Sequence, residues 1–274
     1  MSIKIWLFKI RTRIFGTRNT RKTLPFTFGK IFSRRYNTLF SSTYLSYIPD
    51  RYLGMYQQYR KKPNPFFDEN DIEKWQRGNY INNSGDLPRF YFLNLVIDQL
   101  LHENIQGAAA ELGVYKGNSA FLFQKYVTIT KQKLYLFDTF EGFNNNDLVG
   151  LDKQTDTTMF TDVSLNEVKN LVDTNNVEYV VGYFPDSLSK VDNNENLKFS
   201  VVHIDCDLEL PFKHALEYFY PKLVPGGFLI MHDYFSLHWQ GAIQTMDAFF
   251  TDKPEKLIPV PDKSGTAVIR KTAR

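Results

Sequence analysis

The chain has 274 residues, of which 43% are hydrophobic and 23% charged, so its composition excludes collagen-like, coiled-coil and wholly disordered classes. Its single cysteine, Cys206, cannot form an intrachain disulfide, which excludes a disulfide scaffold. Residues 1–40 hold ten of the 33 basic residues and no acidic one. A strongly basic arm is therefore followed by a mildly acidic body, with 23 basic and 30 acidic residues.

The arm, residues 1–45, has apolar residues at three- and four-residue spacing near its start: Ile3, Leu7, Ile10 and Ile14. This spacing predicts an amphipathic helix over 1–16 whose apolar side enters a lipid headgroup region while its cations face anionic lipid. No apolar run approaches the ~18–20 residues of a membrane-spanning helix. A terminus that is unstructured, or that packs on a partner, is an equal alternative. Because the positive charge is confined to the arm, we expect no nucleic-acid partner.

Residues 46–105 are predicted to form a helical extension that caps the main domain. The segment is rich in aromatic residues, and prolines together with the sequence NNSGDLP at 82–88 divide it. A helix is expected from Leu87 to Leu101. We expect the aromatic side chains to make core or subunit contacts, with sugar stacking as the alternative.

Over residues 106–274, the main domain, short apolar runs alternate with helical patterns. We expect strands at 106–112, 133–138, 177–182, 199–205 and 227–232, helices at 119–130, 164–174, 210–223 and 240–250, and a terminal strand pair at 256–260 and 266–270. This alternation predicts an α/β fold, a Rossmann-like, doubly wound, mostly parallel sheet of about seven strands with an antiparallel C-terminal hairpin. The polar segment 143–162 is too long for an ordinary connection and is predicted to be a functional loop or a lid.

The sequence ELGVYKGNS at 111–119 lies where the first strand of this domain meets a helix. Ligands bind at the carboxyl ends of strands in doubly wound sheets, and Gly113 and Gly117 would let the backbone approach a ligand closely. The pattern lacks the G-x-G-x-x-G of a dinucleotide site, which leaves a nicotinamide oxidoreductase as a remote alternative. The carboxylate of Glu111 favours a cationic or amine-bearing ligand over a phosphate.

The second motif is FDTFEGF at 137–143, directly after the second strand. An acid at this position can accept hydrogen bonds from both hydroxyls of a ribose. Asp138 is the residue expected to do so.

Polar residues also follow two later strands, in HIDCDLE at 203–209 and HDY at 232–234. Because parallel strands end on one rim of a sheet, four side chains are expected to lie close together there: Asp205, Asp207, His232 and Asp233. Such a group can hold one divalent cation, with carboxylates favouring Mg²⁺ and an imidazole shifting the preference toward Mn²⁺, Fe²⁺ or Zn²⁺. Without a metal, Asp205 or His232 could act as general base. His203 is expected to be a buried, hydrogen-bonded histidine.

Taken in order, ELGVYKGNS, FDTFEGF, VVHIDCDLE, LVPGGFLIMHDY and GAIQTMDAFF resemble the macrocin O-methyltransferase (TylF-type) family of class I S-adenosylmethionine-dependent methyltransferases. The resemblance covers roughly residues 85–272 and says little about the acceptor. It implies that S-adenosyl-L-methionine is the cofactor, with Mg²⁺ or Mn²⁺ as a candidate metal.

The resemblance also implies roles for individual residues. Those around the methionine part of the cofactor would be Glu111, near its amino group, with Gly113, Tyr115, Lys116, Gly117 and Ser119. Those that flank its ribose and adenine would be Asp138, Thr139 and Phe140, with Asp186 near the adenine and the lid. Asp205 would also bind the cofactor. The catalytic residues, which would also be the metal ligands, would be Asp205, His232 and Asp233.

The chain departs from the family pattern at two points. Characterised sugar methyltransferases tend to carry two consecutive acids where this chain has His232 and Asp233, which leaves the identity of the metal open. Some relatives use a lid histidine as the base, and 143–162 contains none. The base would then be Asp205, His232 or another group.

The expected activity is transfer of a methyl group to a hydroxyl of a sugar or glycosylated intermediate, in a bacterial cytoplasmic enzyme whose arm could contact the inner face of the membrane. The expected partners are a small-molecule or glycan acceptor and further copies of the chain in a homo-oligomer. The alternatives are a catechol-type or other small-molecule O-methyltransferase, and a catalytically inactive cofactor-binding partner protein.

Overall fold

The structure is a computed structural model that describes residues 69–79, 83, 86–191 and 196–273. The arm at 1–45, its amphipathic helix at 1–16 and the first part of the extension lie outside these residues, so those expectations stay predictions. Among the helices of the described segments, none combines the length and the apolar character that crossing a membrane requires.

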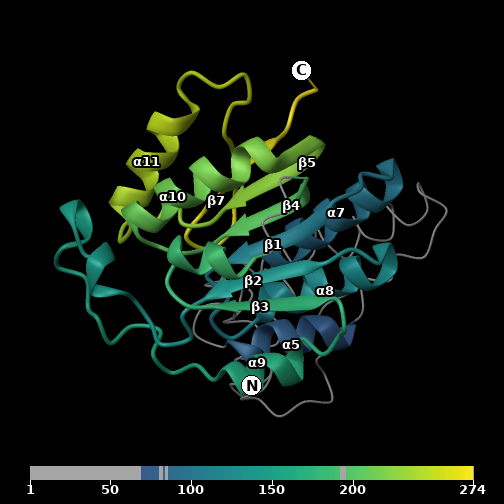
Figure 1. The fold of residues 1–274 in the computed structure, drawn as a ribbon, viewed down its shortest axis with the longest axis horizontal. Helices are drawn as coiled ribbons and strands as arrows, with labels where there is room; N and C mark the ends of the chain where they lie inside the picture. The colour runs from purple at the N-terminus through teal and green to yellow at the C-terminus, as the bar shows by residue number, and fades with distance from the viewer. Residues whose placement is uncertain (1–68, 80–82, 84–85, 192–195, 274) are drawn as a thin grey trace, which may run out of the picture.

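A seven-stranded sheet with the order β3-β2-β1-β4-β5-β7-β6 forms the centre of the described chain (Figure 1). Its strands are β1 (Ala108–Leu112), β2 (Leu134–Asp138), β3 (Val177–Val181), β4 (Phe199–Ile204), β5 (Leu223–Met231), β6 (Ile258–Val260) and β7 (Thr266–Arg270). The first five run parallel, and β7 pairs antiparallel with β5 and with β6. The predicted mostly parallel sheet and its C-terminal antiparallel hairpin are confirmed.

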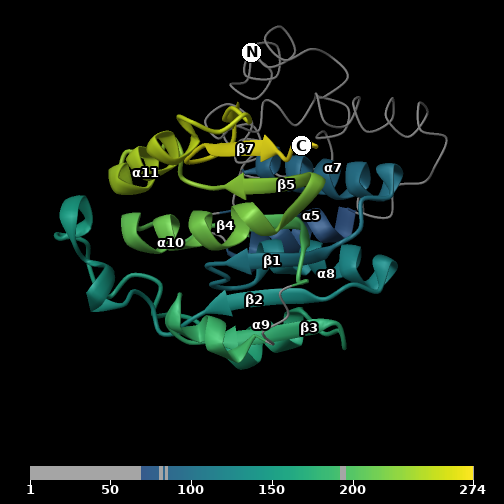
Figure 2. The ribbon, with the colours of Figure 1, turned by 45° about the horizontal axis from the view of Figure 1, so that its top comes forward.

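Helices cover both faces of this sheet (Figure 2). One face packs on α5 (Glu69–Gly78), α7 (Leu87–Glu103), α8 (Asn118–Thr130) and α9 (Leu165–Leu171), and the other on α10 (Glu209–Phe219) and α11 (Gln240–Phe250). Successive strand residues face opposite sides, so Ala109 joins the first core while Ala110 and Leu112 join the second. By the same alternation Glu111 faces α7 and α8, and its neighbour across the β1–β4 pair is His203.

The N-terminal helices are tied to each other at the start of α7. Asp86 is the N-cap of α7, since its side chain accepts the backbone N–H of Arg89. The indole N–H of Trp75 in α5 donates to the backbone carbonyl of Asp86 at 3.0 Å. The helix predicted from Leu87 therefore begins where expected and continues to Glu103.

Two boundaries differ by four residues from the sequence-based expectation, and the others by three or fewer. The strand expected to begin at Gly227 begins at Leu223, because the Pro-Gly-Gly sequence at 225–227 bends within the strand instead of ending it. The bend is a register shift opposite Phe199 and Val201, and Gly226 takes a positive φ of 81° there. The helix expected over 210–223 ends at Phe219 and continues as a single turn of 3₁₀ helix, η5 (Tyr220–Lys222).

The predicted lid at 143–162 contains two short 3₁₀ turns, η2 (Asn145–Asp147) and η3 (Gly150–Asp152). The hydroxyl of Tyr183 donates to Asp147 at 2.7 Å, and the carboxylate of Asp152 accepts the backbone N–H of Glu209 at 2.7 Å. Since α10 begins without a capping side chain of its own, Asp152 supplies the acceptor that its first turn needs. Both contacts hold the lid against the α10 side of the sheet.

The C-terminal segment is held by Glu255, a buried acid between α11 and β6. Its carboxylate accepts hydrogen bonds from the hydroxyl of Tyr220 at 2.5 Å and from the backbone N–H and hydroxyl of Thr272 at 2.9 and 2.7 Å. Burial disfavours the charged form, but these hydrogen bonds outweigh burial and lower the pKa of Glu255 to about 2. The unfolded chain binds this proton at a pKa of roughly 4.3, so the stabilisation is complete above that pH and is lost as pH falls toward 2.

Replacing Glu255 by Gln should therefore lower the free energy of unfolding at pH 7 by about 2–3 kcal/mol and make that energy depend less on pH between 5 and 3. Urea unfolding at pH 3, 5 and 7 measures both effects. Glu73→Gln, at an exposed acid paired with Arg77 in α5, is the control and should change little. A Glu255→Gln protein whose stability falls with acid in parallel with the unmodified chain would contradict this assignment.

Candidate active site

A cavity of about 710 Å³ opens at the carboxyl ends of the parallel strands. It is lined by the turn at 113–116 after β1, the end of β2 with the lid, the ends of β4 and β5, and residues that precede the sheet: Trp75, Asn83 and Arg89. The chain leaves β1 toward β2 and β3 and returns to β4 on the other side of β1. Doubly wound sheets bind ligands at such a reversal of strand order, and the volume is in the ~300–1,000 Å³ range of small-molecule sites.

Asp138, at the end of β2, fixes the turn that follows β1. Its Oδ2 accepts the backbone N–H groups of Val114 and Tyr115 at 2.7 and 2.9 Å, and its Oδ1 accepts that of Phe140 at 2.6 Å. Burial raises the pKa of Asp138, and the backbone hydrogen bonds oppose this rise. A carboxylate has about four acceptor positions, so the three amides leave about one for a ligand hydroxyl. The expected contact with a ribose stays a prediction, and it now concerns one hydroxyl.

The same turn approaches β4 closely at Gly113, whose φ is 85°. A Cβ at this position would overlap the backbone carbonyl oxygen of Asp205. The close approach that requires a glycine is therefore to a neighbouring strand, although Gly113 also lines the cavity. The sequence predicts that Gly113 lets the backbone approach a ligand, and the structure shows that it also lets the turn approach β4.

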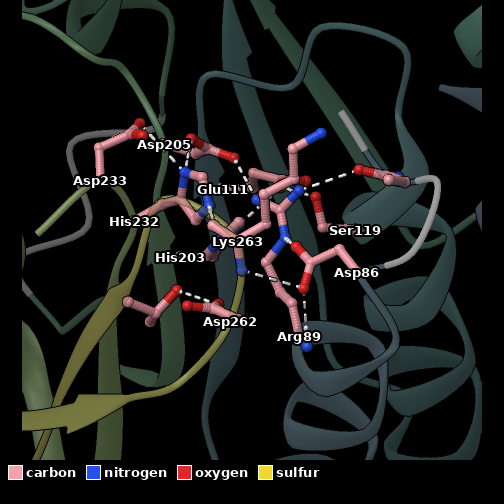
Figure 3. A network of polar contacts seen from close by, with 12 residues as sticks. Asp86, Arg89, Glu111, Ser119, His203, Asp205, His232, Asp233, Asp262 and Lys263 are labelled. Carbon is pink, nitrogen blue, oxygen red and sulfur yellow. Dashed lines mark hydrogen bonds and ion pairs between the residues drawn. The ribbon is translucent and has the colours of Figure 1, made fainter. Parts of the chain in front are cut away.

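Glu111 is fully buried behind Ser119, which lines the cavity. Its Oε1 accepts a hydrogen bond from the Ser119 hydroxyl and lies 2.8 Å from Nδ1 of His203 (Figure 3). Its Oε2 is buried without a hydrogen-bond partner among the described residues. Burial raises the pKa of Glu111, and the hydrogen bond from His203 lowers it. The expectation that His203 is buried and hydrogen-bonded is confirmed.

The ends of β4 and β5 bring Asp205, His232 and Asp233 together (Figure 3). Nδ1 of His232 lies 2.9 Å from Asp205 Oδ1 and 3.0 Å from Asp233 Oδ2, and the three donor atoms are within 4.8 Å of one another. Nε2 of His232 lies 3.1 Å from the backbone carbonyl of Lys263. Burial and the charge of Arg89 oppose protonation of His232, but the two acids outweigh them and raise its pKa well above the ordinary value.

Asp207, two residues beyond Asp205, also lines the cavity and takes a positive φ of 61°. Burial raises the pKa of Asp207 well above its ordinary value, and the negative charges of Asp233 and Asp205 raise it further. The sequence placed Asp207 on this rim but did not single it out as catalytic.

Sequence reasoning missed Arg89, a buried arginine in the first turn of α7. Its guanidinium lies 3.2 Å from Asp205 Oδ2 and 3.1 Å from Asp86 Oδ2, donates to Asn83 Oδ1 at 2.9 Å, and lies over the ring of Trp75 (Figure 3). Asp205 therefore has one oxygen on Arg89 and the other toward His232. The available signal was a lone arginine in the otherwise apolar pattern LPRFYFLNLVI at 87–97.

The lid meets the β1 turn at the edge of the cavity. The hydroxyl of Tyr115 donates to Asp162 at 2.5 Å, and the Lys116 ammonium group lies 2.7 Å from the same carboxylate. The ring of Tyr115 also packs edge-on against Phe160 at 5.2 Å. These contacts join segment 143–162 to the turn predicted to hold the cofactor.

Most of the predicted site residues converge on the cavity. Those that line it are Gly113, Tyr115, Lys116, Ser119, Asp138, Thr139, Asp205, His232 and Asp233. Those that do not are Glu111 and Phe140, which are buried, Gly117, which precedes α8 with a φ of 77°, and Asp186, which is exposed at the start of the 3₁₀ turn η4 (Asp186–Lys190). Beyond β3 the cavity is lined instead by Gly182, Tyr183 and Phe184. The cofactor contacts themselves stay predictions.

Comparisons with known proteins identify a family, a curated relative and solved structures to which the chain is similar. A family model described as macrocin-O-methyltransferase (TylF) matches residues 86–260. The chain is 28% identical over 165 residues to the 8-demethyl-8-(2,3-dimethoxy-alpha-L-rhamnosyl)-tetracenomycin-C 4'-O-methyltransferase of Streptomyces olivaceus, an alignment that covers 54% of this chain. The chain spans 60% of the length of that curated relative.

Two solved structures show the same fold at low identity. The O-methyltransferase NovP aligns with a TM-score of 0.57 and 20% identity, over 68% of this chain and 80% of its own. The calicheamicin methyltransferase CalS11 aligns with a TM-score of 0.55 and 20% identity, over 74% of this chain and 93% of its own. The chain is similar to both in its Rossmann-like methyltransferase fold.

The role of Asp138 in the β1 turn is testable. Asp138→Asn retains the shape of the side chain but replaces one acceptor oxygen by an N–H donor, which would face a backbone N–H of Val114, Tyr115 or Phe140. Because this leaves buried donors without an acceptor, the free energy of unfolding should fall by about 1–3 kcal/mol. Chemical denaturation measures the loss, and Asp156→Asn, at an exposed lid acid, should cause little. Equal stability of the two variants would show that Asp138 does not hold the turn.

Proposed function

The chain belongs to the macrocin O-methyltransferase (TylF) family, and from that membership we propose that it transfers the methyl group of S-adenosylmethionine to a hydroxyl oxygen of a sugar-bearing acceptor. The observation that carries the proposal is that one cavity joins the turns after β1 and β2 to the acidic ends of β4 and β5. The sugar-bearing acceptor is supported by the Streptomyces olivaceus relative, which is named as a 4'-O-methyltransferase of a rhamnosyl compound.

The β1 side of the cavity fits the cofactor. Its methionine part carries an ammonium group. Behind Ser119, which lines the cavity, the buried Oε2 of Glu111 is a carboxyl oxygen that has no partner among the described residues. A buried carboxylate oxygen in this state is costly, so a cationic ligand nearby would stabilise it. Asp138 has an acceptor position left for a ribose hydroxyl. These features favour S-adenosylmethionine over an anionic dinucleotide.

The β4 and β5 side fits a divalent cation at Asp205, His232 and Asp233. These three residues would hold the ion, since Nδ1 of His232 lies 2.9 and 3.0 Å from carboxylate oxygens of Asp205 and Asp233. That nitrogen and Asp233 Oδ2 are buried, and among the described residues they are paired with each other, with Asp205 as the second neighbour of the nitrogen. An Nε2–H group donating to the Lys263 carbonyl would leave Nδ1 free to bind a metal, the usual arrangement of a ligating histidine. An imidazole with two carboxylates favours Mn²⁺ or Fe²⁺ over Mg²⁺.

His232 also lies within 4.8 Å of a second set of donors, on Asp86 and Asp262. There the guanidinium of Arg89 lies 3.1 Å from Asp86 and already supplies a positive charge. We therefore assign the cation to Asp205, His232 and Asp233. When bound, it would lower the pKa of an acceptor hydroxyl.

S-adenosylmethionine supplies an electrophilic methyl group, whose bond to sulfur breaks with the electron pair remaining on sulfur as the acceptor oxygen bonds to the carbon. The chain must then align the acceptor and remove its proton. Asp207 is the candidate base, because it lines the cavity beside Asp233 and, unlike Asp205, has no ion pair with Arg89 or His232. It would receive the hydroxyl proton as the new bond forms.

Two measurements test the activity. The first is calorimetry with S-adenosylhomocysteine, the product form of the cofactor, which should bind one site per chain. The second is mass spectrometry after incubation with S-adenosylmethionine, Mn²⁺ and a panel of TDP-rhamnose, for which CalS11 is a 3'-O-methyltransferase, p-nitrophenyl rhamnoside and catechol. Methylation of a rhamnose compound supports the proposal. Methylation of catechol alone, or cofactor binding without transfer to any sugar, would contradict it.

Replacing Asp207 by Asn should lower kcat about 100-fold or more, because general base catalysis contributes roughly 10²–10⁴ in rate. The Kd values of S-adenosylhomocysteine and Mn²⁺ should stay within a few-fold of those of the unmodified chain. Initial rates with the best acceptor of the panel and calorimetry give the two readouts. Full turnover by Asp207→Asn would exclude it as the base.

Replacing Asp233 by Asn should raise the Kd of Mn²⁺ at least tenfold, because it removes one of three charged or basic ligands. Electron paramagnetic resonance of free Mn²⁺ measures this in the absence of any acceptor. Asp162→Asn, at an exposed acid on the lid, is the matched control and should bind Mn²⁺ as the unmodified chain does. If the unmodified chain takes up no Mn²⁺ at millimolar concentration, the metal assignment is wrong while methyl transfer is still open to test.

A further inference from the structure

We propose that His203 is a positioning residue that holds the carboxylate of Glu111 so that its free oxygen receives the ammonium group of the cofactor. The inference rests on the proposed function, because it requires the cofactor or its product in the cavity. His203 lies inside the sheet and does not line the cavity.

The pairing of β1 with β4 sets the geometry. Glu111 and His203 are register partners across these parallel strands, and both side chains lie on the α7 and α8 side of the sheet. Nδ1 of His203 lies 2.8 Å from Oε1 of Glu111, and neither side chain is exposed. The contact joins residues 92 positions apart in the chain, so it exists only because the strand order reverses at β1.

Both hydrogen bonds to Glu111 fall on the same oxygen. Ser119, in the first turn of α8, donates its hydroxyl to Oε1, where His203 also points. When Glu111 is a carboxylate it only accepts hydrogen bonds, and the proton of the His203 ring is then on Nδ1. The carboxylate is thereby fixed from two sides, and its second oxygen, Oε2, is left without a partner among the described residues.

The ring of His203 lies 6.0 Å from that of Phe123 in α8, and its Nε2 is buried without a hydrogen-bond partner in the part of the chain that the structure describes. A buried polar pair of this kind contributes little to stability compared with an apolar pair of similar volume. Its effect is instead on orientation, because a carboxylate held by Ser119 alone could turn and place either oxygen against the hydroxyl.

Three variants separate positioning from packing. His203→Leu removes the donor and approximates the volume, and His203→Asn keeps an N–H donor at the position of Nδ1. Tyr126→Phe is the matched control, because it removes a different buried hydrogen bond between α8 and β4, the one from Tyr126 to Ser200 at 2.7 Å. Chemical denaturation of each variant establishes that it is folded before binding is measured.

Calorimetry with three nucleosides, two with the ammonium group and one without it, then measures how much this group contributes to binding. The probes are S-adenosylhomocysteine, its decarboxylated analogue, which keeps the ammonium group, and 5'-methylthioadenosine, which lacks it. His203→Leu should raise the Kd of the first two about tenfold and change that of methylthioadenosine less than twofold. His203→Asn should recover most of the affinity, and Tyr126→Phe should leave the ratio of the three Kd values unchanged.

The possible negative results distinguish a failure of the positioning role of His203 from a failure of the proposed function. If His203→Leu weakens all three probes equally, or none of them, the positioning role is wrong while the cofactor site stands. If the unmodified chain binds none of the probes, the proposed function is wrong and this inference falls with it.

Discussion

The reversal of strand order at β1 and β4 is the constraint on which the rest of the site depends. The chain segments that follow β1 and β4 lead away from each other at the carboxyl ends of these two neighbouring strands. A cavity therefore opens between the turn at 113–116 and the end of β4. The turn then needs a glycine, because Gly113 approaches the backbone of Asp205, and it needs an acceptor for its amides, which Asp138 supplies. Backbone packing and hydrogen bonding thus shape the site before any ligand is considered.

Charge balance is the second requirement at the strand ends. Five acids gather in this region: Asp86, Asp205, Asp207, Asp233 and Asp262. Arg89 offsets part of their charge from a helix that precedes the sheet. Without a bound metal, the acids also raise the pKa of His232 and favour its positive form. A surplus of negative charge remains, which favours a divalent cation and a sulfonium cofactor over anionic ligands.

Much of this arrangement could be predicted from the sequence. Apolar alternation gave the order of strands and helices, and the rule that parallel strands end on one rim brought Asp205, Asp207, His232 and Asp233 together. The β5 boundary was wrong because Pro-Gly-Gly is a turn signal that here forms a bend inside a strand. Arg89 was missed because helical periodicity predicts which side of α7 is buried, but it does not predict which residue an individual side chain contacts. The contact between Glu111 and His203 was beyond reach, since it depends on the register of two strands far apart in the chain.

Titration of the unmodified chain with S-adenosylhomocysteine and, in parallel, with NADH tests the central claim most directly. The account requires saturable binding of S-adenosylhomocysteine at one site per chain, with a Kd below about 100 μM, or roughly −5.5 kcal/mol, and no comparable binding of NADH. A cavity that binds NADH, or that takes up no S-adenosylhomocysteine at millimolar concentration, would contradict it.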